Sequence, residues 1–117
     1  PANPATIRAS LGTLFSVPLA VASVGEVIDW LAASGRRVVL AVPEAGMPWH
    51  AAELATTAIV LGSEAHGISS AWQAAADDGR LDAHAVTLPM LGVADSLNVS
   101  ATAAVLAYEA VRQATSR

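Results

Sequence analysis

The stretch LPMLGVADSLNVS, residues 88–100, lies between a strand-like apolar run and an alanine-rich helical pattern. The pattern after it predicts a last helix from about Leu97 to Ala114. Four polar residues interrupt this otherwise apolar stretch: Asp95, Ser96, Asn98 and Ser100. Capping of a helix start accounts for Asp95 and Ser100. The other two polar residues are candidates for a site at the point where a strand gives way to the last helix.

Strand-like and helix-like patterns alternate along the rest of the chain. Capping signals, Asn3-Pro4, Ser23 with Glu26, and Ser70 with Gln73, mark the helix starts. Strands are predicted over Val17–Ala22, Arg37–Val42, Thr57–Leu61 and Ala85–Leu88. The other helices are predicted from Pro4 to about Leu14, from Ser23 to a stop at Gly35, and from Ser70 to about Gly79. Residues 43–55 are predicted to form a loop or a short helix.

This alternation predicts an α/β domain with a mostly parallel sheet and helices on both faces, because the strands are apolar along most of their length. Ligands of such sheets bind at the carboxyl ends of the strands. The site is therefore expected in the segments that follow the second, third and fourth strands.

The composition of the chain excludes several classes of function. The 117 residues suffice for one domain or a piece of one, and 54% are hydrophobic. The net charge of −4 excludes a general basic surface, so any contact with nucleic acid must be local. No cysteine is present, and the three histidines, His50, His66 and His84, lack metal-ligand spacing, so no metal is expected. No apolar run is long enough to cross a membrane, and a cytoplasmic location is expected.

The loop GSEAHG, residues 62–67, follows the third predicted strand. Glu64 stands where the second glycine of a dinucleotide-binding loop would be, and its charge would repel a pyrophosphate. The loop suits an uncharged or cationic ligand better than a phosphate. Taken alone, however, this motif is better explained as a plain tight turn with an exposed glutamate. The sequence also leaves two roles for Trp49: it either borders a ligand or covers the edge of the core.

Three segments together resemble the SpoU (TrmH-type) branch of the SPOUT RNA methyltransferases. The family's middle motif is G-x-E-x-x-G, and its last motif is (I/L)-P-M-x-G-x-x-x-S-L-N-V-S, followed by a helix that ends near Y/F-E-x-x-R-Q. The last motif and the helix after it match at Leu88, Pro89, Met90, Gly92, Ser96, Leu97, Asn98, Val99, Ser100, Glu109, Arg112 and Gln113. The segment R-A-S-x-G-x-x-F-x-x-P is matched by Arg8, Ala9, Ser10, Gly12, Phe15 and Pro18.

The resemblance implies a C-terminal trefoil knot that holds S-adenosylmethionine, a homodimer, and methyl transfer to a ribose 2′-hydroxyl of rRNA or tRNA, with rRNA favoured. By position it implies cofactor contacts at Ala41, Gly62, Leu88 and Leu97. It assigns the polar, catalytic positions to Glu64, Ser96 and Asn98. Arg8 either contacts RNA phosphate or is an exposed helix arginine.

One family motif has no counterpart here. N-x-x-x-x-x-R, which supplies the arginine assigned to activating the hydroxyl, is matched nowhere in residues 1–117. The resemblance therefore implies a methyltransferase domain over residues 1–117 that lacks its first strand and helix, and a chain that is inactive alone. Two alternatives stay open: a non-catalytic RNA-binding or dimerisation remnant of this fold, and an unrelated flavodoxin-like nucleotide-binding module.

The last helix carries two apolar stripes. The first consists of Val99, Ala103, Leu106 and Ala110, and the second of Leu97, Ala101, Ala104, Tyr108 and Val111. A single sheet contact requires only one stripe. Dimers of the family pack this helix near the partner's site, so the resemblance implies a homodimer made partly by this helix. Burial of both stripes within one chain is the alternative.

Overall fold

The computed structural model describes residues 18–43, 46–62, 67–88 and 99–116. Their strands form one parallel sheet in the order β2-β4-β1-β3. The strands are β1 (Val38–Ala41), β2 (Met47–Pro48), β3 (Ala58–Val60) and β4 (Ala83–Thr87). The helices are α2 (Val24–Ser34), the single 3₁₀ turn η2 (Trp49–Ala51), α3 (Ser70–Asp77) and α4 (Val99–Thr115).

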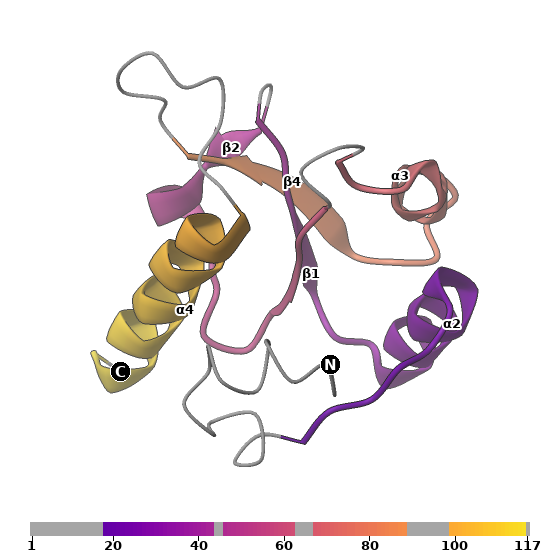
Figure 1. Ribbon diagram of the computed structural model, residues 1–117, viewed down its shortest axis with the longest axis horizontal. Coiled ribbons are helices and arrows are strands. Elements are labelled where there is room, and N and C mark those ends of the chain that lie inside the picture. Colours follow the sequence, from indigo (N-terminus) through magenta and orange to yellow (C-terminus); the bar gives the residue numbers. More distant parts are fainter. Residues whose placement is uncertain (1–17, 44–45, 63–66, 89–98, 117) are drawn as a thin grey trace, which may run out of the picture.

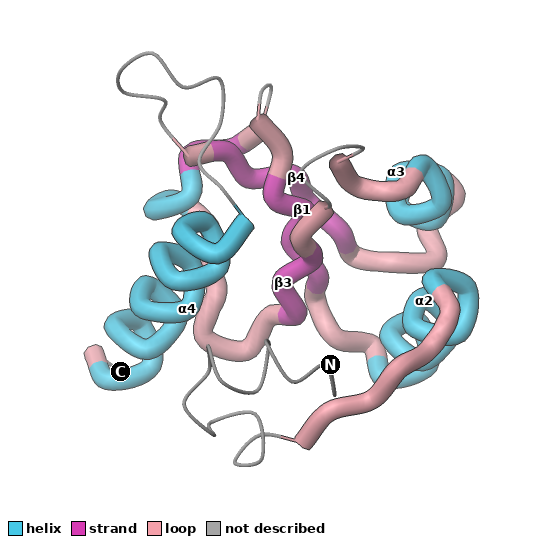
Figure 2. The backbone as a smooth tube through the Cα atoms, viewed as in Figure 1, coloured by secondary structure: helices cyan, strands magenta, loops and turns pink. Residues whose placement is uncertain are grey.

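The sheet lies between two helical layers (Figures 1 and 2), with α2 and α3 on one side and α4 on the other. Neighbouring residues of β1 point to opposite faces. Leu40 belongs to the apolar cluster under α2 and α3, whereas Val39 belongs to the cluster under α4 that contains the fully buried Leu106. The predicted fold class, a parallel sheet with helices on both faces, is confirmed.

Local signals place α2 as the sequence predicts. The Ser23 hydroxyl accepts a hydrogen bond from the Glu26 amide, and the Glu26 carboxylate accepts one from the Ser23 amide, both at 3.1 Å. These bonds lower the pKa of Glu26, with the backbone bond from Ser23 the larger cause. At the other end Gly35 has φ 67°, a conformation that glycine adopts without steric cost.

The strand predicted at Val17–Ala22 is wrong for the part that the structure describes. Residues 18–22 form no regular element and are exposed, with Val21 at 82%. An apolar run becomes a strand only where a neighbouring strand satisfies its backbone hydrogen bonds, and the described sheet pairs none with this run.

Two other boundaries differ from the prediction. The cap of α3 is Ser69 rather than Ser70, because the Ser69 hydroxyl accepts from the Ala71 amide while Gln73 instead bonds Asp77. β4 begins two residues before the predicted Ala85, since the Val38 amide already donates to the carbonyl of residue 82.

The remaining predictions divide between confirmed elements and undescribed residues. Residues 43–55 contain the two-residue strand β2 as well as the short helical turn η2. The last helix is confirmed from Val99, and its expected first residues lie outside the described ranges, as do residues 89–98 and the helix predicted at residues 4–14. The expected C-terminal trefoil knot stays a prediction. No helix in the described part of the chain has the length and apolarity to cross a membrane.

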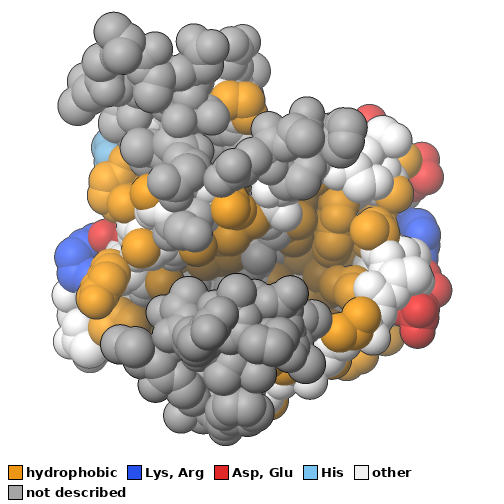
Figure 3. Space-filling view, viewed as in Figure 1, with side chains coloured by type: hydrophobic (Ala, Val, Ile, Leu, Met, Phe, Trp, Pro, Cys, Tyr) orange, Lys and Arg blue, Asp and Glu red, His pale blue; other side chains and the backbone are white. Residues whose placement is uncertain are grey.

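Strand position in the sheet sets how well each strand is covered. Val38, Val39 and Leu40 of β1 are buried because strands flank β1 on both sides, whereas all of β3 at the end of the sheet is half-buried. Figure 3 shows hydrophobic side chains gathered in the middle of the view, between α4 and the pair α2 and α3.

Candidate functional site

Three of the predicted cofactor residues lie at the carboxyl ends of three adjacent strands. Ala41 ends β1, Leu88 directly follows β4, and Gly62 stands two residues after β3. The register pairs residue 41 with Val86 of β4, and Leu40 with Val60 of β3. The sheet therefore brings the three positions to one edge, where parallel sheets bind ligands.

Hydrogen bonds lock the ends of β1 and β4 together. The Val42 amide donates to the Val86 carbonyl at 2.9 Å, and the Thr87 hydroxyl donates to the Pro43 carbonyl at 3.1 Å. Leu88 is buried in the cluster under α4, and Ala41 packs against the same cluster. These two residues thus face the α4 side of the sheet and supply an apolar surface at its carboxyl edge.

Glycines permit close backbone contacts at this edge. A Cβ on Gly62 would overlap the backbone of residues 67 and 68, at 2.6 Å from the Gly67 carbonyl oxygen. A Cβ on Gly46 would lie 2.8 Å from the Val86 carbonyl carbon, so β2 can lie against the end of β4 only with glycine there. Sequence reasoning missed Gly46, for which the signal was a glycine in the segment after β1.

The other predicted site residues lie outside the described ranges: Glu64, Ser96, Leu97, Asn98 and Arg8. Two of the undescribed segments, 63–66 and 89–98, follow strands of the sheet in the sequence. Gly62 and Gly67 flank the first segment, and Leu88 and Val99 flank the second.

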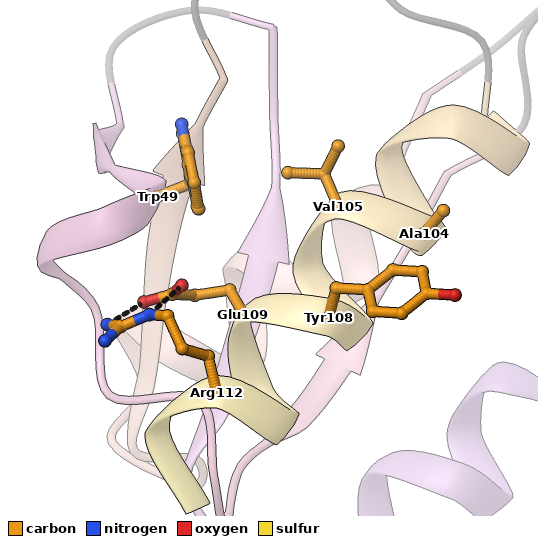
Figure 4. Close-up of a pocket in the computed structure, with 6 residues that line it drawn as sticks. All are labelled: Trp49, Ala104, Val105, Tyr108, Glu109 and Arg112. Atoms are coloured by element: carbon orange, nitrogen blue, oxygen red, sulfur yellow. Dashed lines mark hydrogen bonds and ion pairs between the residues drawn. The ribbon is translucent and has the colours of Figure 1, made fainter. Parts of the chain in front are cut away.

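A groove of about 390 Å³ lies between Trp49 and α4. Figure 4 shows Trp49 on one side, the Tyr108 ring pointing away from it, and the Glu109 carboxylate turned to the Arg112 guanidinium. The groove is lined by Trp49, Ala104, Val105, Tyr108, Glu109 and Arg112. Of the predicted cofactor residues that the structure describes, none lines it. Trp49 instead packs against the core cluster under α4.

Glu109, buried to 6% exposure, carries the main charge pairing of α4. Its carboxylate accepts from Arg112 Nε at 2.8 Å and Nη2 at 2.7 Å, and from Gln113 Nε2 at 3.0 Å. The Arg112 bonds, and next the Gln113 bond, lower the pKa of Glu109 to about 2. The same pairing raises the pKa of Arg112. All three residues match the family's closing motif, for which the sequence alone gave no role.

Acidic and histidine side chains elsewhere are dispersed. Asp82 bonds His84 at 2.9 Å and Arg37 at 3.3 Å on the exposed amino-terminal side of the sheet, and these bonds lower the pKa of Asp82. No group of three or more His, Asp or Glu within the described ranges could hold a metal ion.

Two relatives of this chain are RNA 2′-O-methyltransferases. The chain is 36% identical over 118 aligned positions to a 23S rRNA (uridine(2479)-2′-O)-methyltransferase from Streptomyces viridochromogenes, with 95% of this chain and 39% of the relative covered. It is 46% identical over 57 residues to a tRNA (guanosine(18)-2′-O)-methyltransferase from Thermus thermophilus, with 49% of this chain and 26% of the relative covered. The chain thus spans well under half the length of these relatives.

Solved structures agree with the fold. An RNA 2′-O ribose methyltransferase superposes with a TM-score of 0.83 at 39% identity, covering 96% of this chain and 42% of that one. The SpoU methyltransferase AviRb from Streptomyces viridochromogenes, solved with AdoMet, gives 0.76 at 36% identity, covering 97% and 46%. The model of the SpoU rRNA methylase family matches residues 1–108. With the parallel sheet and its glycine-lined carboxyl edge, this match shows that the chain belongs to the SpoU rRNA methylase family.

Proposed function

We propose that this chain is part of an S-adenosylmethionine-dependent methyltransferase that acts on a ribose 2′-hydroxyl of RNA, with rRNA favoured over tRNA. The observation that carries the proposal is the convergence of Ala41, Gly62 and Leu88 at one sheet edge, in a chain of this family. The rRNA preference rests on the relative that aligns with 95% of the chain. A flavodoxin-like module is not favoured by any of these similarities.

The residues at the carboxyl edge fit the cofactor. The described positions there are uncharged: Ala41, Val42, Pro43, Leu61, Gly62, Thr87 and Leu88. Apolar side chains suit the face of a neutral adenine, and backbone groups beside glycine supply its hydrogen bonds. Glu44 and Glu64 follow β1 and β3 in the sequence, and their negative charges favour a cationic sulfonium over a phosphate.

The bound cofactor would supply an electrophilic methyl group, and the chain would orient the ribose. A ribose hydroxyl is a poor nucleophile at neutral pH, so its placement and deprotonation limit the rate. We assign Asn98 and Ser96 to hydrogen bonds that orient the substrate and the last loop, and Glu64 to holding that loop. Leu97 would contact the cofactor within the trefoil knot, and Arg8 would bind an RNA phosphate. With RNA as the substrate, we place the protein in the cytoplasm.

A homodimer through α4 is part of the proposal. Tyr108 is 77% exposed and Val111 58%, while Leu106 on the opposite side of the helix is fully buried. The exposed positions Ala104, Ala107, Tyr108 and Val111 recur at helical spacing and form one apolar stripe. The structure excludes burial of this stripe within the described part of the chain, which supports a second copy as its cover.

The test of function is methyl transfer from labelled S-adenosylmethionine to transcribed 23S rRNA and to tRNA, with the Streptomyces relative as the positive control. Residues 1–117 match no N-x-x-x-x-x-R, so we expect transfer about 10²- to 10⁴-fold slower than that enzyme's. Asn98→Ala should slow it by a further factor of about 100 through misplacement of the hydroxyl. Gln73→Ala is the control, since the exposed Gln73 side chain bonds only Asp77 of α3 among the described contacts. An undiminished rate in Asn98→Ala would contradict the assignment.

A further inference from the structure

The Gln113 side chain joins the end of α4 to the segment before β3. Its Oε1 accepts from the Leu54 amide at 2.7 Å, and its Nε2 donates to the Ala52 carbonyl at 2.8 Å. Nε2 also donates to Glu109 at 3.0 Å. One side-chain amide thereby satisfies two backbone groups of a turn whose side chains, Ala52 and Leu54, are buried.

The turn that Gln113 holds is tied to the sheet. The Thr57 amide donates to the Leu54 carbonyl at 3.3 Å, and the Ala58 amide donates to the Arg37 carbonyl at 2.9 Å as β3 begins. β3 then leads to Gly62 at the candidate site. At its other end α4 starts at Val99, directly after the segment that holds Ser96 and Asn98. Gln113 therefore connects α4 to the segment that leads through β3 to Gly62.

The hydrogen bonds of Gln113 restrict movements of α4 that apolar packing allows. Leu106 packs α4 on the sheet, but burial of apolar surface is non-directional and tolerates rotation and sliding of a helix. The bonds of Gln113 lose strength when a donor turns or moves by a few tenths of an ångström. Since Gln113 and Val99 are fourteen residues apart, or about 21 Å along the helix, a small tilt at one end displaces the other.

Glu109 fixes which way the Gln113 amide faces. Its pairing with Arg112 holds the pKa of Glu109 at about 2, so at neutral pH the carboxylate only accepts hydrogen bonds. Nε2 rather than Oε1 must then face Glu109, which leaves Oε1 for the Leu54 amide.

We infer that Gln113 is a positioning residue for the cofactor site, because its bonds to residues 52 and 54 set the register of α4 against the sheet, where Leu106 of α4 packs in one cluster with Leu88 and Ala41. The inference rests on the proposed cofactor function. It gives Gln113 a role in ligand affinity although the residue lies at the far end of the helix from the site.

Calorimetry with S-adenosylhomocysteine tests the inference. Gln113→Leu keeps the size and removes the hydrogen bonds, and we expect affinity to fall by about 2- to 30-fold, the usual range for coupling between distant sites. Gln73→Leu on α3 is the matched control, since it makes the same change in a glutamine that bonds only within its own helix among the described contacts. Amide exchange at Leu54 should accelerate in Gln113→Leu alone.

Gln113→Glu gives a readout that loss of folding cannot imitate. A protonated glutamic acid can accept from the Leu54 amide and donate one of the two bonds that Nε2 makes, whereas its carboxylate cannot donate and would repel Glu109. The charged groups around residue 113 are Glu109 and Arg112 on α4, Glu53 of the adjoining turn, and His50 of η2, which also contributes to the lowered pKa of Glu109. The ratio of the variant's Kd to the wild-type Kd should therefore approach one as pH falls from about 8 to about 5.

The outcomes separate the two claims. Wild-type protein that does not bind S-adenosylhomocysteine would overturn the proposed function and this inference with it. Wild-type binding together with unchanged affinity in Gln113→Leu, or a pH-independent ratio in Gln113→Glu, would overturn the positioning role alone.

Discussion

The backbones of Gly62 and Gly67 lie so close that the Gly67 carbonyl oxygen is 2.6 Å from where a Cβ of residue 62 would stand. Gly62→Ala must therefore push the two ends of the GSEAHG loop apart. We expect a loss of about 1–3 kcal/mol in the free energy of unfolding, as for other overpacked sites. Binding of S-adenosylhomocysteine should weaken in parallel, as measured by calorimetry.

Gly25→Ala is the control for this substitution. A Cβ at Gly25 meets nothing within 4 Å, and the position lies in α2, where alanine should stabilise by about 0.5–1 kcal/mol. Equal cofactor affinity in Gly62→Ala and the wild type would remove the close approach from the candidate site. Preferential binding of NADH or FMN would refute the methyltransferase proposal itself.

The exposed stripe of α4 predicts how the protein assembles. A dimer of standard size would bury about 800 Å² on each partner. Replacing Tyr108 and Val111 together by Ser should raise the dimer dissociation constant at least about tenfold, because central aromatic residues contribute most to interfaces. Sedimentation at micromolar concentrations measures it. Trp30→Ser provides the comparison, since Trp30 is 63% exposed on α2. If the Trp30 variant dissociates instead, the interface lies on the other side of the sheet.

Glu109 predicts an acid-sensitive contribution to stability. Its pKa is about 2 in the folded chain against an ordinary value of 4.5, so the unfolded chain binds the proton more readily. The stability from the Arg112 and Gln113 bonds is complete above about pH 4.5 and is lost as pH falls towards 2. Urea unfolding at pH 6 and pH 3 should show a smaller decrease in Glu109→Gln than in the wild type. An identical decrease in both proteins would assign the acid sensitivity to other carboxylates.

The reciprocal bonds of Ser23 and Glu26 predict the cost of removing a helix cap. Ser23→Ala leaves the Glu26 amide without its side-chain acceptor and should destabilise the chain by about 1 kcal/mol. Ser23→Asp retains an acceptor and should restore most of that loss. Thermal unfolding followed by circular dichroism measures both variants, and a Ser23→Ala chain as stable as the wild type would show that α2 depends on packing alone.

Features encoded by adjacent residues were predictable from the sequence. The cap at Ser23, the stop at Gly35 and the apolar strand at residues 38–41 all depend on neighbours within a few positions. The run 18–22 had the same apolar character, yet a strand also requires a partner, and no local pattern reveals whether one is present.

The candidate site was predictable only in part, for the same reason. The alternation of elements predicted a site in the segments after the strands, and the structure brings Ala41 and Leu88, which the family resemblance singled out, to that edge. Their contacts with a cofactor stay a prediction. Gln113 had only a motif match, because its partners lie 59 and 61 positions away in the sequence. Contacts of that range depend on how the layers are assembled rather than on local spacing.

The strand order β2-β4-β1-β3 also has a consequence for the time course of folding. β1 and β4 are neighbours at the centre of the sheet, although β2, β3 and α3 all lie between them in the sequence. During synthesis β1 must wait until residue 87 has left the ribosome before its central partner exists, and α4 arrives later still. Pairing across such long sequence separations is slow because the loop must close before any contact forms. We therefore expect the α2–β1 unit to spend this interval with its apolar face uncovered, which makes it the segment that chaperones would bind.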